Sequence, residues 1–207
     1  MQTAPVSPEG PPTWRSRERI LHAAKTLFAE RGYDNTSTVA IARMAGTSES
    51  QLVKHFGSKE GLLEAIFDDG WAAMSEGLLA LQGRPGPERL RAMMDLVLRR
   101  LQHDPELKEL MLLEGRRVRK EGHMIMLTRG FMDFVGSIDS VLEEMRAAGR
   151  LRPDLPVEVA RSALMGMFEG LLRDQLLARR ANYHASYSDA QLRQVFDLVL
   201  ASFILRS

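Results

Sequence analysis

The sequence predicts an all-α protein of about nine helices, in which three small helices precede several larger ones. Apolar residues recur at spacings of three and four along most of the 207 residues, which is the period of an amphipathic helix. The alternating apolar and polar pattern of a half-buried strand is nearly absent. Glycine and proline fall between the periodic segments, so the chain divides into helices joined by short breaks.

Helix start and stop signals divide the first 60 residues into three short helices. Serine and threonine favour N-caps, because their side chains accept a hydrogen bond from a backbone N–H of the first turn. Glycine favours helix ends because it adopts positive φ without strain. The expected helices cover residues 16–31, 36–45 and 48–55. The expected cap and turn residues are Gly32, Thr36 or Ser37, Gly46 and Ser48.

Longer helices are expected after this region. Ser58 can cap a helix that runs to Leu81 with apolar residues on its inner side. The segment 83–87 contains two glycines and two prolines, which predicts a joint between helices. The later helices are expected at residues 88–103, 105–119, 123–148, 156–182 and 189–205.

Composition excludes several classes of protein. No run of 18 apolar residues occurs, so no membrane-spanning helix is expected. The absence of cysteine excludes disulfides and thiol catalysis, and it fits a reducing cytoplasm. The five histidines are scattered, and no phosphate-cradling loop, zincin histidine pair or nucleophile elbow occurs. We therefore expect no catalytic residues, no metal and no cofactor.

The second and third short helices have the plan of a helix-turn-helix, which places one helix in the DNA major groove. Their expected small core consists of Val39, Ile41, Ala42, Ala45, Leu52 and Phe56. The outward residues of the third helix are Glu49, Ser50, Gln51, Lys54 and His55. Residues 14–60 carry eight Lys or Arg against five Asp or Glu, and this local excess of positive charge favours contact with phosphate. A solvated helix of an ordinary protein is the alternative interpretation.

About 50 residues here resemble the N-terminal domain of the TetR-type family of transcriptional regulators. The resemblance rests on the Ala-Ala-x-x-Leu-Phe-Ala-Glu-x-Gly-Tyr run over residues 23–33, and on the Ala-Gly-x-Ser turn over residues 45–48. It also rests on Leu-x-x-His-Phe-x-x-Lys over residues 52–59. Three proline-containing clusters near the start of the sequence predict a disordered tail over residues 1–14. The resemblance implies a DNA-binding domain over 15–60, and a helical ligand-binding and dimerisation domain over 61–207.

The resemblance also implies roles for residues of the head. Those at the start of the recognition helix are expected to read bases: Glu49, Ser50 and Gln51. The expected phosphate contacts are Thr38, Lys54, His55 and Lys59. The sequence departs from the family in two ways, because Val53 replaces a usual tyrosine, and Val39 and Ala40 stand where polar DNA contacts sometimes occur. Fewer backbone contacts weaken binding and flatten its dependence on salt.

Family members dimerise through their last two helices, and the sequence supports a homodimer. Small residues at spacings of three and four on the helix 156–182 permit close approach by another helix. The expected interface residues are Ala163, Gly166, Gly170, Leu192, Phe196 and Val199. Packing within one chain is the alternative. A dimer with two heads matches a palindromic site in double-stranded DNA.

Family members also bind a small molecule within the larger domain. The candidate pocket residues are Trp71, Met93, Met124, Phe131, Phe134, Phe168 and Glu169. The alternative for each apolar residue of this set is ordinary packing in the core. The alternative for Glu169 is an ion pair with Arg173, one helical turn further along the chain. The sequence predicts a repressor that an unidentified effector releases from DNA. The alternative is a helical small-molecule-binding protein with weak or lost DNA binding.

Overall fold

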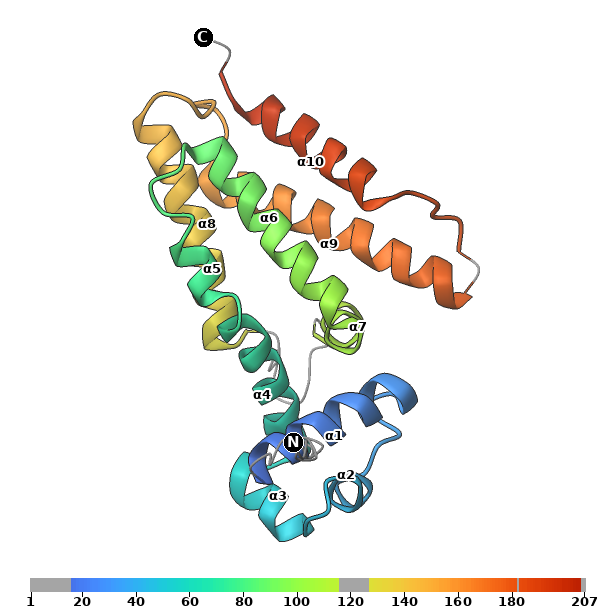
Figure 1. Ribbon diagram of the computed structural model, residues 1–207. Coiled ribbons are helices and arrows are strands. Elements are labelled where there is room, and N and C mark those ends of the chain that lie inside the picture. Colours follow the sequence, from blue (N-terminus) through green and yellow to red (C-terminus); the bar gives the residue numbers. More distant parts are fainter. Residues whose placement is uncertain (1–15, 116–126, 182, 206–207) are drawn as a thin grey trace, which may run out of the picture. The chain divides into compact units, whose positions relative to one another are not determined.

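The structure, a computed structural model, describes residues 16–115, 127–181 and 183–205 (Figure 1). These residues form ten helices, and their one extended pairing is an isolated bridge between Leu151 and Ile204. The predicted all-α class is confirmed. None of the helices in the described ranges combines the length and apolar character needed to cross a membrane.

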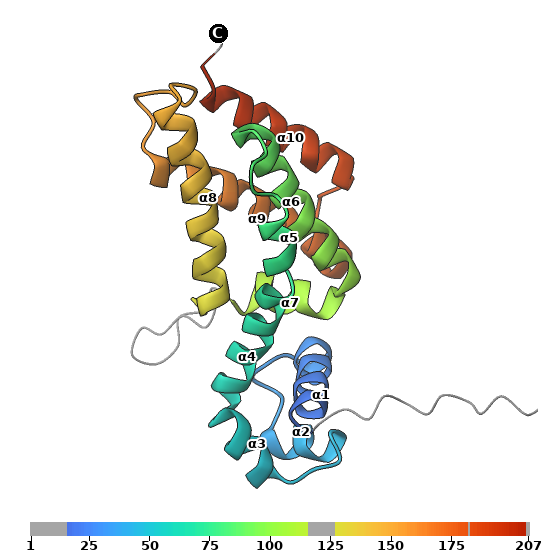
Figure 2. The ribbon, with the colours of Figure 1, turned by 60° about the vertical axis from the view of Figure 1, so that its left-hand side comes forward.

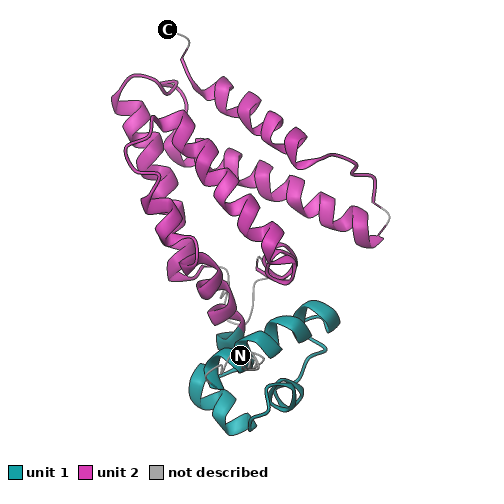
Figure 3. Ribbon diagram, in the orientation of Figure 1, with its two compact units in different colours: residues 1–62 teal, residues 63–207 magenta. Residues whose placement is uncertain are grey.

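The chain divides into two compact units, with unit 1 at residues 1–62 and unit 2 at residues 63–207 (Figure 3). The division falls within the helix α4 (Lys59–Ala72), which therefore contributes residues to both units.

Unit 1 is a three-helix head followed by the start of α4. Its first helix α1 (Ser16–Arg31) packs on α2 (Thr38–Met44) and α3 (Glu49–Phe56), and α2 packs on α3. The three helices bury one apolar side each, and removal of this surface from water holds the head together. The core of the head includes Ile20, Ala24, Phe28, Ile41 and Leu52.

Cap residues of the head lie where their chemistry predicts. Gly32 ends α1 at φ +82° and Gly46 makes the turn between α2 and α3 at φ +61°, a region that favours glycine. Ser37 caps α2 by accepting from the backbone N–H of Ala40 at 3.2 Å. Thr36, the other candidate, is buried and donates its hydroxyl hydrogen bond to the backbone oxygens of Leu27 and Gly32.

Unit 2 contains the remaining helices, which pack as a bundle (Figure 2). The helix α9 packs against α7, α8 and α10, while α6 packs against α5, α7, α8 and α10. The helix bounds are α5 (Ser75–Leu79), α6 (Gly86–His103), α7 (Pro105–Leu113), α8 (Arg129–Ala147), α9 (Val157–Ala181) and α10 (Asp189–Phe203). Ion pairs from Arg91 to Asp197 and from Arg193 to Asp95 tie α6 to α10.

The single helix expected from Ser58 to Leu81 is a wrong prediction, because it divides into α4 and α5. The backbone N–H of Met74 bonds to the carbonyl oxygen of Trp71 at 2.9 Å, a tight turn in place of a continuing helix. This turn places the side chain of Met74 in the core. No proline lies at the break, so packing of Trp71 and Met74 accounts for it.

Two other helices are shorter than predicted within the described residues. The helix expected over 105–119 ends at Leu113, and the one expected over 123–148 begins at Arg129. Thr128 caps α8 by accepting from the backbone N–H of Phe131 at 3.3 Å. The parts of both predictions within residues 116–126 lie outside the described residues.

Candidate functional site

The start of α3 presents a row of polar side chains to solvent. Ser48 caps the helix by accepting from the backbone N–H of Gln51, and Leu52 on the other side is fully buried. The side chains of Glu49, Ser50 and Gln51 are all exposed. Burial of Leu52 fixes the rotation of α3, so these three side chains stay outward.

One contact joins the starts of α2 and α3. The hydroxyl of Thr38 donates a hydrogen bond to Oε1 of Glu49. The hydroxyls of Ser48 and Ser50 lie 2.9 Å apart, within hydrogen-bond distance. The first contact orients the carboxylate of Glu49 and leaves its second oxygen able to accept. Thr38, a predicted phosphate contact, thus also positions Glu49.

Lys59, a predicted phosphate contact, makes several contacts within the head. Its Nζ donates to the backbone oxygens of Tyr33 at 2.9 Å and Thr36 at 3.0 Å. The same ammonium lies 4.2 Å from the centre of the Tyr33 ring, a cation–π distance. Lys59 therefore ties the start of α4 to the loop between α1 and α2.

Lys54 and His55 are both exposed on α3, as a contact with DNA phosphate requires. Two valines nearby lie at the surface: the exposed fraction is 51% for Val39 and 49% for Val53. The prediction that Val39 belongs to the small core is wrong, whereas Ile41 and Ala42, which were predicted with it, are buried. The surface of α2 and α3 thus exposes two apolar side chains.

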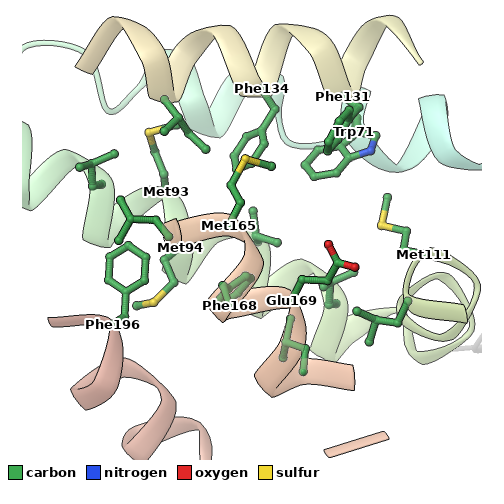
Figure 4. A pocket seen from close by; sticks show the side chains of 17 residues that line it. Trp71, Met93, Met94, Met111, Phe131, Phe134, Met165, Phe168, Glu169 and Phe196 are labelled. Atoms are coloured by element: carbon green, nitrogen blue, oxygen red, sulfur yellow. The ribbon is translucent and has the colours of Figure 1, made fainter. Parts of the chain in front are cut away.

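Unit 2 holds an apolar cavity of about 100 Å³ (Figure 4). Its walls come from the end of α4 and from α6, α7, α8, α9 and α10. The lining residues are Trp71, Leu90, Met93, Met94, Val97, Leu101, Met111, Leu112, Phe131, Phe134, Ile138, Leu164, Met165, Phe168, Glu169, Leu172 and Phe196. Each of the six helices that form the wall contributes a methionine or an aromatic side chain that is labelled in Figure 4.

Six of the seven predicted pocket residues line this cavity: Trp71, Met93, Phe131, Phe134, Phe168 and Glu169. The seventh, Met124, lies outside the described residues. Prediction from the sequence missed most of the wall that α6 provides. The apolar stripe of α6 could have indicated it, because Leu90, Met94, Val97 and Leu101 recur at helical spacing.

Three aromatic rings form one side of the cavity. The ring of Trp71 stacks on Phe134 with centroids 4.8 Å apart, and it meets Phe131 edge-on at 5.4 Å. Such aromatic pairs stabilise a folded protein by about 0.5–1.5 kcal/mol beyond the contribution of their buried surface. The arrangement fixes the plane of the Trp71 indole against α8.

Glu169 is the one ionisable side chain among the lining residues that the structure describes. Figure 4 shows its carboxylate between Phe168 and Met111 in this view. The predicted pair with Arg173 is present at 3.9 Å. A second hollow between α8 and α9 shares Phe131, Met165 and Glu169 with the cavity wall, so Glu169 lies where the two meet.

The predicted dimer residues fall into two groups. Ala163 and Gly166 are exposed on α9, and Gly170 is half-buried. Leu192 and Phe196 are only 1% and 5% exposed, because α10 packs them against the chain's own core. Their assignment to a dimer surface is therefore wrong, and Phe196 lines the cavity instead.

The remaining residue of the set, Val199, is half-buried on α10. The apolar side chains that α10 does expose are Val195, Leu198 and, just beyond its end, Leu205. In the ranges that the structure describes, no three His, Asp or Glu side chains are grouped to hold a metal ion.

Residues 20–66 match the family model described as bacterial regulatory proteins, tetR family. The chain is 28% identical over 197 residues to the HTH-type transcriptional repressor AcnR of Corynebacterium efficiens, covering 90% of this chain and 92% of that protein. It is 27% identical over 175 residues to the transcriptional regulator UidR of Escherichia coli K12, covering 81% and 87%.

Solved structures share the fold. The regulator FadR of Bacillus subtilis, in complex with stearoyl-CoA, is similar with a TM-score of 0.78 and 21% identity over 89% of this chain and 97% of that one. The fatty acid degradation regulator FadR of Bacillus halodurans gives a TM-score of 0.77 and 19% identity, over 92% and 96%.

Proposed function

Because the chain belongs to the tetR family of bacterial regulatory proteins, we propose that it is a DNA-binding repressor released from its operator by a small molecule in unit 2. The observation that carries the proposal is the exposed polar start of α3 on a helix whose opposite side is buried. Relatives along most of the chain are transcriptional repressors and regulators, which supports the same role.

In this proposal the first turn of α3 reads base edges in the major groove. Gln51 matches adenine, which it can bond with both amide atoms, and Ser50 can bond several bases. Glu49 repels phosphate but accepts a hydrogen bond from the amino group of cytosine. Lys54 and His55 then supply the side-chain contacts to phosphate.

The direct test is selection from a pool of random duplex DNA at low salt, followed by a mobility-shift assay on the enriched sequence. We expect one enriched motif whose binding weakens steeply as salt rises, since phosphate contacts release counterions. A matched protein with Gln51→Glu adds a second carboxylate to the reading surface and should lose the shift while keeping its helical content. Failure of the unaltered protein to enrich any sequence would favour the alternative function.

The contact between Thr38 and Glu49 leads to a prediction about the operator. Glu49→Gln should change the preferred base at one position of each half-site from cytosine to adenine, because glutamine donates and accepts where glutamate only accepts. Discrimination of about 1–3 kcal/mol is expected for such a contact. Repeating the selection with this variant measures it.

Thr38→Val serves as the companion variant for that measurement. It removes the orienting hydroxyl, so base preference at the same position should weaken while total affinity changes little. An unchanged motif in both variants would show that Glu49 does not read a base.

We also propose a homodimer that reads a palindromic operator. Support comes from the exposed small residues Ala163 and Gly166 on α9 and the exposed Val195 and Leu198 on α10. Such a surface suits close packing of two helices from each subunit. Two heads related by a two-fold axis then match two half-sites.

Gly166→Leu tests the dimer. Within one chain, a Cβ at Gly166 meets nothing within 4 Å, so leucine should stabilise the isolated α9 by about 1 kcal/mol. Against a second copy the added side chain blocks close approach, and the dimer dissociation constant should rise at least about tenfold, which corresponds to 1.4 kcal/mol. Sedimentation over a concentration series measures it.

Gly136→Leu on α8 is the matched control, since Gly136 is also exposed with nothing within 4 Å of its Cβ position. The control should leave the dimer unchanged. If both leucine variants dimerise like the original protein, the α9 surface is not the interface.

The proposed effector site is the cavity of unit 2. Trp71 lies at the end of α4 and lines the cavity, while Lys59 at the start of α4 is tied to the head. A ligand that shifts Trp71 therefore acts on a helix that belongs to both units. Release requires the ligand to bind more tightly to the conformation that does not bind DNA. Only the difference between its affinities for the two conformations shifts their populations.

Two observations favour the alternative of weak or lost DNA binding. Val39 and Val53 expose apolar side chains on α2 and α3, and Thr38 and Lys59 are engaged within the head. Both reduce the number of phosphate contacts, and affinity falls with that number. The selection at low salt described above separates this alternative from the repressor.

A further inference from the structure

The third helix of the head leaves one apolar side chain at the surface. Val53 on α3 is 49% exposed, whereas Leu52 beside it is fully buried and Phe56 is half-buried. Valine is also a poorer helix former than alanine or lysine, because its branched Cβ restricts the side chain within a helix. Neither the core of the head nor the stability of α3 therefore accounts for a valine at this position.

Val53 adjoins the polar row at the start of α3. Residues three and four apart are neighbours on the surface of a helix, so Val53 lies next to both Ser50 and Glu49. The Cα–Cβ bond of a helical residue tilts toward the N-terminus, and the methyl groups of Val53 therefore lean toward these two side chains. The contact with Thr38 orients the carboxylate of Glu49 beside them. An apolar group and a hydrogen-bond acceptor thus lie side by side on the proposed base-reading surface.

Resting on the proposed function, in which α3 enters the major groove, we propose that Val53 recognises the methyl group of a thymine. Valine has no hydrogen-bonding group in its side chain, so apolar contact is what it can add to DNA recognition. The C5-methyl group of thymine is the apolar group that a base edge presents in the major groove. Contact between the two removes both apolar surfaces from water, and a cytosine at the same place lacks the methyl group.

The spacing of residues on α3 also places this thymine within the operator. A helix rises by about 1.5 Å per residue, so Val53 lies about 6 Å along the axis from Glu49. Neighbouring bases of one DNA strand are about 3.4 Å apart along the duplex. The thymine that Val53 contacts therefore lies within about two base pairs of the base that Glu49 reads.

Replacement of thymine by deoxyuridine tests the proposal, because it removes the methyl group and keeps every hydrogen-bonding atom of the base. The sequence enriched by the selection from random DNA is made as a series of duplexes, each with one thymine replaced. Titration with the full-length protein should show roughly three- to fivefold weaker binding at one thymine position of each half-site, as expected for burial of one methyl group. That position should lie within about two base pairs of the one at which Glu49→Gln changes the preferred base.

Two alanine variants assign the contact to one valine. Val53→Ala removes the apolar contact, so it should bind the thymine and deoxyuridine duplexes equally. Val39→Ala makes the same change at a valine with a similar exposed fraction of 51%. Val39 lies on α2, and the first helix of a helix-turn-helix crosses the DNA backbone instead of entering the groove. Val39→Ala should therefore keep the roughly three- to fivefold preference for thymine. Thermal unfolding of each variant checks that it is folded.

The proposal is overturned if no deoxyuridine weakens binding, or if the preference for thymine survives in Val53→Ala. Loss of the preference in Val39→Ala alone would also overturn it, because the contact would then belong to α2. An enriched sequence without a thymine that depends on Val53 leaves the proposed function intact and removes only this inference. Failure of the unaltered protein to enrich any sequence removes both.

Discussion

Lys59→Met should lower the free energy of unfolding of the head by about 2 kcal/mol. The ammonium donates to the backbone oxygens of Tyr33 and Thr36, and hydrogen bonds from a charged group contribute about 1.5–3 kcal/mol when buried. Partial exposure of Lys59 to water reduces that value, whereas loss of the cation–π contact with Tyr33 adds to the effect. Hydrogen exchange of the α1 to α3 amides in the full-length protein measures the change.

Lys54→Met is the matched control, because Lys54 is exposed on α3 and is a proposed phosphate contact. It should leave amide exchange unchanged. It should reduce the slope of log binding constant against log salt concentration by about one, as expected when one phosphate contact is lost. The two variants thus distinguish a lysine that stabilises the head from a lysine that contacts DNA phosphate. Equal protection of the head amides in both variants would show that the Lys59 bonds do not stabilise the head.

Phe134→Ala should lower the free energy of unfolding of unit 2 by about 3–5 kcal/mol, as expected for a large-to-small change in a core. Phe134 is buried, stacks on Trp71 and lines the cavity, so its removal enlarges a space that is already present. Indole or benzene added to the variant should restore part of the stability, since an enlarged apolar cavity binds small aromatic molecules. Denaturant unfolding with and without each compound measures both effects.

Met132→Ala is the control on the same helix, because Met132 is exposed two residues away. It should cost less than about 0.5 kcal/mol, as is usual for surface changes, and should not respond to aromatic compounds. If Phe134→Ala is no less stable than Met132→Ala, then unit 2 does not depend on the cavity wall.

Local signals in the sequence predicted most of the head. Gly32 and Gly46 lie at positive φ where the helix ends require it, and Ser48 caps α3. These features depend on a few neighbouring residues, so they can be read from the sequence without knowledge of the fold. The apolar and aromatic residues expected around a pocket likewise gather at one cavity, because they are the large apolar side chains of helices that share a core.

Other features depend on which neighbour a side chain meets. Lys59 has the position of a phosphate contact but bonds the backbone of the α1–α2 loop, 23 and 26 residues away. Leu192 and Phe196 have the spacing of an interface stripe, yet their own chain buries them. Periodicity shows that one side of a helix is apolar but does not say whether the partner is the same chain or another copy.

The sequence by itself therefore determined the all-α class, the caps and turns of the head, the polar start of α3 and the apolar character of the larger unit. Each follows from contacts within a few residues or from the helical period. Only the tertiary structure decided the break between α4 and α5, the structural use of Lys59, the pairing of Thr38 with Glu49, and the joining of Trp71 and Glu169 at one cavity. The physical reason is that these contacts join residues far apart in the chain, or depend on how distant helices pack, and no local pattern encodes that packing.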